Sequence, residues 1–278
     1  MKRDRGNLIL VIVFIIGLSV MLYPSVSDYW NSRTQSRAVA TYSETVESMS
    51  EEDYDRMFRE AEVYNRELSR LRAPFLNYDE VEGYEDILDV SGTGIMGYVT
   101  IEKIKVELPI YHGVEDSTLQ VAAGHLQGSS LPIGGRGTHS VISAHRGLPS
   151  ARLFTRLDEM EEGDTFTVTV LNRRLTYQVD QILVVEPHEI SELQIDPEED
   201  YCTLMTCTPY GINSHRLLVR GVRIAAGDAG AYVPADAYQI NTLIVAIVIA
   251  LLMLVVLLPV MELIRRRRGH RRAGRRRK

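Results

Sequence analysis

The sequence predicts a mostly β domain, closed or nearly closed, between two apolar segments. Three observations lead to this prediction. Short runs rich in β-branched residues follow one another from residue 94 to about residue 224, and turn-forming residues separate them. A helical pattern precedes these runs, and an uncharged apolar stretch lies near each end of the chain. About eight short strands of this kind are typical of a β-barrel or a closely related closed sheet.

The two apolar stretches predict membrane segments. Residues 240–260 carry no charge, and a helix of about 20 apolar residues spans the hydrocarbon core of a bilayer. Residues 8–23 are also uncharged, but this run is shorter and follows the basic sequence MKRDR. It is therefore interpreted as either a membrane anchor or the apolar region of a signal peptide, with a conceivable cleavage site at 25–27. In both cases the residues that follow are exported.

The charge distribution predicts the orientation of the chain and the class of partner. Basic flanks remain in the cytoplasm, and the last 14 residues, RRRRGHRRAGRRRK, include ten Lys and Arg. The tails contribute net charges of +2 and +10 to a total of −6, so the chain between them carries −18. An acidic exported domain is not expected to bind nucleic acid. The basic C-terminal tail is interpreted as an anchor on anionic lipid instead.

A helix is predicted before the strands. Ser50 is a plausible N-cap, because three acidic residues follow it in what would be the first turn. Apolar residues then recur at spacings of three and four, which favours a helix that packs on the domain over a coiled coil of only about two heptads. The residues of this stripe are Met57, Ala61, Tyr64, Leu68 and Leu71. The helix should end before Pro74, and residues 73–91 form an acidic loop.

The strand region begins with GIMGYVTIEKIKVELPIYHG, which predicts two strands with a break near Ile104 and Lys105. THSVISAH, at 138–145, predicts a strand after a glycine-rich loop. Residues 149–160 are compatible with a short helix that points Leu153, Phe154 and Leu157 inward. TFTVTVLNRRLTYQVDQILVV predicts a hairpin with its turn at Asn172 and Arg173. CTLMTC and HRLLVRGVRI are the last two strands.

The two cysteines, Cys202 and Cys207, lie on one predicted strand. Five residues of strand separate their Cα atoms by roughly 16 Å and place the side chains on opposite faces. A disulfide requires Cα atoms within about 7 Å of each other. We therefore expect both thiols to be free. Cys202 is interpreted as a small buried hydrophobic residue, whereas for Cys207 that interpretation and a reactive thiol both remain open.

Two further residues are candidates for a site with Cys207. His145 ends its predicted strand at a rim, and Arg216 lies just across a short turn from the thiol. A guanidinium at that place can donate hydrogen bonds to a developing oxyanion, although a lone arginine is most often a surface charge. His215 should point to the opposite face. His112, His125 and His188 are interpreted as solvated surface histidines, and His270 as cytoplasmic.

No metal or cofactor is expected. The chain contains neither a C-x-x-C nor an H-x-x-x-H spacing, so a zinc site is not predicted from its cysteines and histidines.

The stretch Thr203 to Cys207, TLMTC, resembles the TLxTC signature of sortases, the cysteine transpeptidases of Gram-positive surfaces. Three further stretches are similar to the class C, pilin-polymerising group. They are CTPYGINSHRLLVRG at 207–221, SAHRGLP at 143–149 and GYVTIEKIKVELPIYHG at 97–113. The second membrane segment is also shared with that group, and the likeness extends over nearly the whole chain.

The resemblance implies an eight-stranded β-barrel with an N-terminal helical extension and flanking transmembrane helices. It implies that Cys207 is the nucleophile, His145 the general acid/base and Arg216 the stabiliser of the transition state. The substrate would carry an LPxTG-type sorting signal, and a lysine of another pilin subunit would accept the acyl group. The alternatives are a sortase that attaches surface proteins to peptidoglycan and a non-catalytic receptor or scaffold domain.

One feature departs from the class C pattern. These sortases usually carry a lid with an Asp-Pro-aromatic motif, and the matching place here contains Ala73, Pro74 and Phe75. Phe75 could still cover Cys207, but the carboxylate that would pair with the arginine is missing. Pro74 and Phe75 are therefore the lid candidates, and we expect a lid that holds less tightly.

The expected organisation places the catalytic domain on the extracellular face of the cell membrane, with two membrane spans. In order, the predicted segments are a cytoplasmic tail at 1–6, a transmembrane helix or signal anchor at 7–23, a helical extension with a lid-like loop at 24–92, the barrel at 93–225, a linker at 226–239, a transmembrane helix at 240–263 and a basic cytoplasmic tail at 264–278.

Overall fold

The structure is a computed structural model that describes residues 2–225, with side chains from residue 11 onward. The described chain divides into two units between residues 27 and 28, and each is considered by itself. The predicted linker, the second transmembrane helix and the basic C-terminal tail lie outside the described residues.

The first unit contains the start of helix α1 (Lys2–Glu47). Its apolar residues from Val11 onward meet the length and composition of a membrane span, with a mean hydropathy of 1.9 over the most apolar window and none of that window buried. Within the described residues this is the one helix that passes the test, and a signal sequence would pass it too. The helix continues through Pro24 into the second unit.

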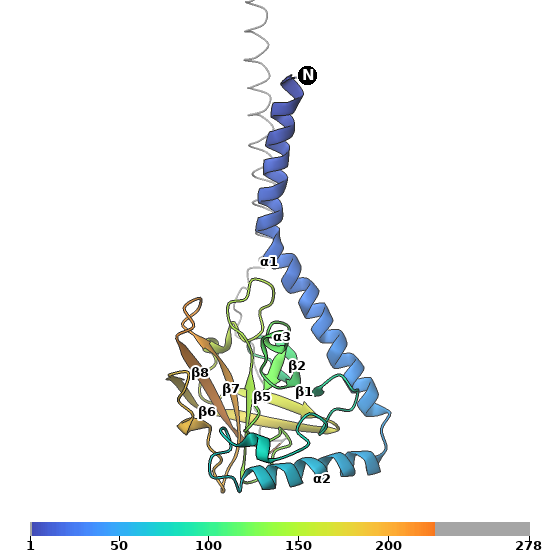
Figure 1. Cartoon of the computed structure of the whole chain (residues 1–278), viewed down its shortest axis with the longest axis vertical. Helices are drawn as coiled ribbons and strands as arrows, with labels where there is room; N and C mark the ends of the chain where they lie inside the picture. Colours follow the sequence, from blue (N-terminus) through green and yellow to red (C-terminus); the bar gives the residue numbers. More distant parts are fainter. Residues whose placement is uncertain (1, 226–278) are drawn as a thin grey trace, which may run out of the picture. The chain divides into compact units, whose positions relative to one another are not determined.

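Helix α2 (Glu51–Leu68) follows after a short turn and confirms the predicted N-cap. The Ser50 side chain accepts a hydrogen bond from the backbone N–H of Asp53 at 3.2 Å, which satisfies one of the free amides of the first turn. The predicted stripe is buried from Met57 to Leu68, and Leu71 packs partly against the core. Figure 1 shows α2 lying across one end of the strands.

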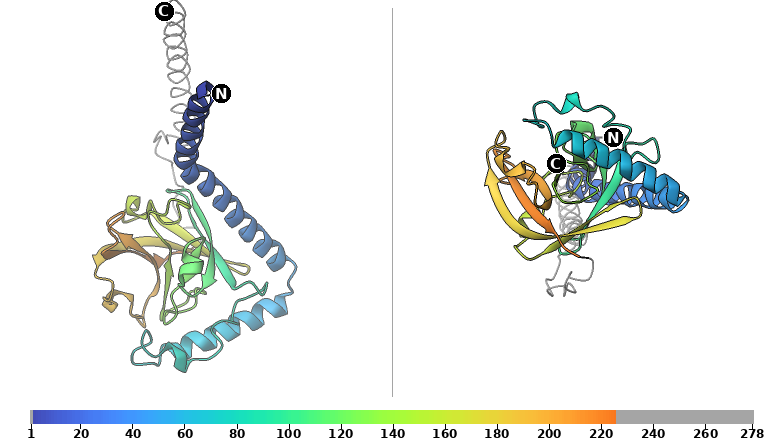
Figure 2. Two further views of the ribbon diagram at one scale, coloured as in Figure 1. Left: turned by 45° about the horizontal axis from the view of Figure 1, so that its top comes forward. Right: turned by 90° about the horizontal axis from the view of Figure 1, so that it is seen from below.

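Eight strands form a closed barrel in the order β1-β2-β3-β4-β7-β8-β6-β5, which confirms the predicted fold class. Figure 2 shows the strands curving around the barrel from two further directions. The pairs β2–β3 and β4–β7 are parallel, and the other pairs are antiparallel. The strands are β1 (Ile95–Ile101), β2 (Val106–His112), β3 (Ala123–His125), β4 (Thr138–Ser143), β5 (Thr165–Val170), β6 (Arg173–Val185), β7 (Asp200–Thr208) and β8 (His215–Arg223).

Four short helices lie in the connections: η1 (Tyr78–Glu80), α3 (Asp116–Leu119), η2 (Leu157–Glu159) and η3 (Ser191–Leu193). The later part of α1 is fixed to the barrel through Tyr42, which is 2% exposed. Its hydroxyl donates to the carbonyl of Met96 at 3.0 Å and accepts from the N–H of Leu171 at 2.8 Å. Because both partners belong to the barrel, the helical extension and the barrel share one core.

Two local predictions are wrong. Residues 149–160 form turns and the single turn of η2 instead of a helix, because Leu153 has φ +40° and the N–H of Phe154 donates to the carbonyl of His145 at 3.2 Å. The three apolar side chains of this segment are nevertheless buried as predicted. Strand β4 ends at Ser143, so His145 lies two residues beyond the strand instead of at its end.

Candidate active site

Two strand pairings determine where the candidate residues lie. In the antiparallel pair β7–β8, Cys207 is directly opposite Arg216, so the structure confirms that these two residues are neighbours. In the parallel pair β4–β7, Ser143 is opposite Met205, with a constant offset along the strands. Strand β4 ends at Ser143, and His145 follows two residues later, at the same end of the sheet as Cys207 and Arg216. The three candidate residues therefore come from the same end of three neighbouring strands.

The chain beyond β4 stays attached to β7 up to the residue before His145. The N–H of Ala144 donates to the carbonyl of Met205 at 3.1 Å. The hydroxyl of Thr206, which is 1% exposed, donates back to the carbonyl of Ala144 at 2.7 Å. This hydroxyl links the residue before Cys207 to the residue before His145. The sequence analysis did not identify Thr206 as a residue of the site.

Both cysteines are free, which confirms the predicted absence of a disulfide. Cys202 is 0% exposed, and burial raises the pKa of its thiol well above the ordinary value, because a thiolate there would lose its hydration. Cys202 therefore behaves as the small buried hydrophobic residue that was predicted. Cys207, by contrast, is only half-buried.

The guanidinium of Arg216 contacts only backbone carbonyls in the described part of the chain. Its Nη1 donates to the carbonyls of His215 at 3.2 Å and Asn213 at 3.5 Å. Within that part no carboxylate forms an ion pair with it, in keeping with an alanine at position 73. Donors of the half-buried guanidinium are therefore available to an oxygen of a ligand.

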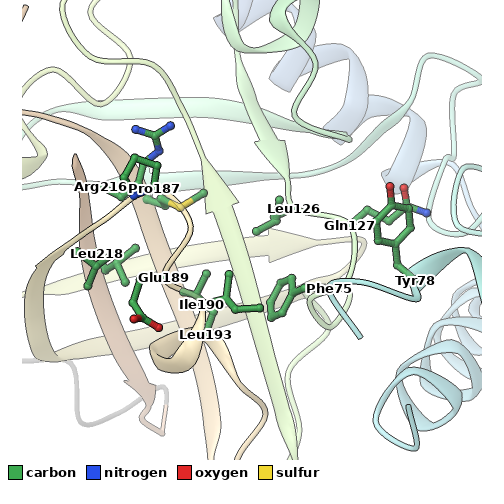
Figure 3. A pocket seen from close by; sticks show the side chains of 12 residues that line it. Phe75, Tyr78, Leu126, Gln127, Pro187, Glu189, Ile190, Leu193, Arg216 and Leu218 are labelled. Carbon is green, nitrogen blue, oxygen red and sulfur yellow. The ribbon is translucent and has the colours of Figure 1, made fainter. Parts of the chain in front are cut away.

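A cavity of about 270 Å³ opens beside Arg216. Figure 3 shows Phe75 among the apolar side chains of its wall, with Arg216 at the edge. The lining residues are Phe75, Tyr78, Leu126, Gln127, Val185, Pro187, Glu189, Ile190, Leu193, Met205, Arg216 and Leu218. The structure thus places the lid candidate Phe75 in the cavity next to the arginine, whereas Cys207 is not among the lining residues.

The loop after His145 is held to helix α1. Asp28 accepts a hydrogen bond from the backbone N–H of Arg152 at 2.9 Å and pairs with its side chain at 3.0 Å. The side-chain amide of Asn31 donates to the carbonyl of Ser150 at 2.9 Å. The helix that follows the apolar segment therefore contacts the loop of a candidate catalytic residue.

The interpretation of two other histidines was wrong. His112 and His125 are 6% and 0% exposed, on strands β2 and β3, and are not surface residues. His125 contacts the hydroxyl of Tyr84 at 3.0 Å and the carbonyl of Ser130 at 2.8 Å, and burial lowers its pKa to about 4. His188, by contrast, is 81% exposed, as predicted.

Comparison with known proteins shows the family of the chain. A family model described as the sortase domain matches residues 99–224. The crystal structure of sortase C1 from Streptococcus agalactiae is 47% identical, and the match covers 68% of this chain and 98% of that one, with a TM-score of 0.62. The chain belongs to the sortase family, in its class C.

Two other proteins are similar to this sortase. The sortase C of Streptococcus pneumoniae, a structure described for its catalysis and pilin substrate specificity, is 46% identical, with 68% of this chain and 97% of that chain covered and a TM-score of 0.62. Sortase D of Bacillus subtilis is 28% identical over 131 residues, which are 46% of this chain and 63% of that protein. The matched part is thus less than two thirds of that more distant relative.

Proposed function

We propose that this sortase is a membrane-anchored cysteine transpeptidase that cleaves an LPxTG-type sorting signal and joins the acyl group to a lysine of another pilin subunit. The observation that carries the proposal is the register of β7 and β8, which sets the free, half-buried Cys207 directly opposite Arg216. Within the described residues, no carboxylate occupies that guanidinium.

In the first half of the reaction, the Cys207 thiolate attacks the carbonyl carbon of the signal's threonine. Arg216 donates hydrogen bonds to the oxyanion, and His145 gives a proton to the leaving glycine amine. A C–S bond forms and the Thr–Gly amide C–N bond breaks, which leaves a thioester. Dividing one amide exchange into two steps of this kind lowers the barrier of each.

In the second half, the lysine amine attacks the thioester carbonyl. His145 accepts a proton from the amine, an amide C–N bond forms, and the sulfur leaves as the thiolate. The amide that forms replaces the amide that broke, so no oxidant, reductant or cofactor is required. Each turnover returns Cys207 and His145 to their initial states.

The membrane segments account for how the enzyme would meet its substrates. We infer that the apolar part of α1 anchors the acidic domain on the extracellular face, with a second anchor at 240–263. Substrates that emerge tethered to the same membrane would then have a high effective concentration at the site. The sortase C of S. pneumoniae, which is similar over 68% of this chain, supports a pilin as the substrate.

Loop 73–75 would act as a lid in this proposal. The ring of Phe75 lies in the cavity beside Arg216, where apolar side chains of a sorting signal would otherwise bind. Ala73 has no carboxylate that could pair with Arg216. The closed loop is therefore held by the apolar packing of Phe75. The lid would therefore open more easily than one that also carries an ion pair.

The test uses the full chain in detergent micelles with an LPxTG peptide and three acceptors: a lysine-bearing pilin domain, a peptidoglycan-derived amine and water. We expect a covalent peptide–pilin product that is abolished in Cys207→Ala. Transfer to the peptidoglycan amine alone would replace the proposal with cell-wall anchoring. A folded wild-type chain that cleaves no peptide would leave a binding or scaffold domain.

A further inference from the structure

Arg146, the residue after His145, has an unusual environment for an arginine. Its side chain is only 9% exposed. Nη2 lies 2.6 Å from Oδ2 of Asp158, and Nη1 donates to Oγ1 of Thr208 at 3.2 Å. Within the described residues, the buried Nε makes no hydrogen bond. Burying an unpaired charge costs several kcal/mol. Without these two contacts, the guanidinium would therefore be expected to turn toward solvent.

The two contacts join three parts of the chain. Arg146 adjoins His145, Thr208 adjoins Cys207 at the end of β7, and Asp158 belongs to η2. One side chain thus connects the loop of the candidate acid/base to the strand of the candidate nucleophile. A guanidinium is planar and presents its donors in a fixed fork, so the two bonds fix an orientation as well as a distance.

The loop after His145 is also held by hydrogen bonds to residues 154 and 155, at its other end. The carbonyl of His145 accepts from the N–H of Phe154 at 3.2 Å, and the N–H of Gly147 donates to Oγ1 of Thr155 at 3.3 Å. These bonds close the loop on itself but do not reach β7. Thr206 links β7 to Ala144, before His145, and Arg146 links β7 to the residue after His145 through Thr208.

We propose that Arg146 is a positioning residue of this sortase: through Asp158 and Thr208 it sets the separation between the imidazole of His145 and the sulfur of Cys207. The proposal rests on the proposed function for the roles of those two groups. A thiolate is stabilised by a nearby imidazolium, and that attraction weakens as the groups move apart. Loss of either contact should therefore change how Cys207 ionises, without a change in any group that touches the substrate.

The experiment compares two neighbouring carboxylates of η2 in the full chain in detergent micelles. Asp158→Asn removes the ion pair to Arg146, whereas the matched control Glu159→Gln removes an exposed pair to Arg156 on the same turn. Thr208→Val removes only the second contact. The first readout is the rate of alkylation of Cys207 by iodoacetamide as a function of pH, without peptide. Cys202 is fully buried and should not react.

We expect Asp158→Asn and Thr208→Val to move the midpoint of the alkylation profile to higher pH, while Glu159→Gln follows the wild type. With an LPxTG peptide, kcat should fall by about tenfold in the first two variants, because a displacement of about 1 Å is sufficient for such losses, and KM should stay within about twofold. A merely structural role would lower the melting temperature but would not move the pH midpoint.

Profiles that superimpose on the wild type, or an equal shift in Glu159→Gln, would overturn the proposal. If Asp158→Asn does not fold, Thr208→Val decides, because it keeps the ion pair intact. The proposed function fails separately: a wild-type chain that is alkylated at Cys207 but cleaves no peptide contradicts transpeptidation, and the alkylation profiles still test the position of Arg146.

Discussion

Gly128 lies directly beneath Phe75: a Cβ atom built on Gly128 would be 3.0 Å from the Cα of Phe75 and 3.1 Å from its ring. Gly128 also has φ +94°, which favours glycine over any residue with a side chain. The loop with the lid candidate thus packs closely on the backbone of Gly128, and a methyl group there would push it outward by a few tenths of an ångström. Two substitutions can therefore disturb the same contact from its two sides.

The first prediction concerns access to Cys207. Half-burying a phenylalanine ring contributes about 1 kcal/mol to the closed loop, so Phe75→Ala should raise the open population about fivefold. Labelling of Cys207 by a bulky thiol reagent should accelerate by that factor, and Gly128→Ala should act in the same direction. Leu76→Ala, in the same loop but 75% exposed, is the matched control. Equal rates in wild type and Phe75→Ala would mean that the loop does not shield the site.

The second prediction concerns the bonds between α1 and the loop after His145. Asp28→Ala and Asn31→Ala remove hydrogen bonds to Arg152 and Ser150. A net bond contributes about 1 kcal/mol to holding the loop in place, so we expect peptide cleavage to slow in each variant, by up to roughly fivefold. Gln35→Ala breaks a similar bond from α1 to Val121, away from that loop, and should leave the rate unchanged. Equal losses in all three variants would point to general destabilisation instead.

The third prediction is a loss of stability in acid. Burial lowers the pKa of His125 and of His139 from 6.5 to about 4. Between these values the unfolded chain binds protons that the folded chain does not, so the free energy of unfolding falls as pH drops from about 6.5 to about 4. From pH 7 to pH 5 each histidine should contribute a loss of about 2 kcal/mol.

Denaturant unfolding at pH 7 and pH 5 measures this loss. His139→Gln should reduce the pH dependence, because its imidazole contacts the carbonyl of Gln194 and the hydroxyl of Thr203 in a buried place. His188→Gln, at an exposed position, should leave the dependence as it is in the wild type. An unchanged slope in His139→Gln would show that this histidine is not held neutral by the fold.

How much the sequence could predict depends on whether a feature is local. The longer strands were predictable because alternating apolar residues recur with period two between turns, whereas the three-residue β3 was not predicted. The pairing of Cys207 with Arg216 was predictable because a single short turn joins their strands. The thiols could be called free from the spacing of Cys202 and Cys207 on one strand. Each of these inferences uses residues that are close together in the chain.

Features that depend on distant contacts were missed. His112 and His125 are buried because their ring nitrogens meet carbonyls and a hydroxyl of other segments, which no local pattern reveals. Residues 149–160 have the apolar spacing of a helix, but bonds to His145 and to α1 impose turns. Arg146 looks like an ordinary surface charge until Asp158 and Thr208 are placed beside it.

The most direct measurement is the intact mass of the full chain after rapid mixing with an LPxTG peptide in the absence of an amine acceptor. The account predicts an increase equal to the acyl portion of the peptide, located on Cys207 by fragmentation and absent in Cys207→Ala. It also predicts that Arg216→Lys accumulates the adduct at least tenfold more slowly, because the guanidinium donors to the oxyanion are lost. A peptide cleaved at the wild-type rate by Cys207→Ala, or an adduct on any other residue, would contradict it.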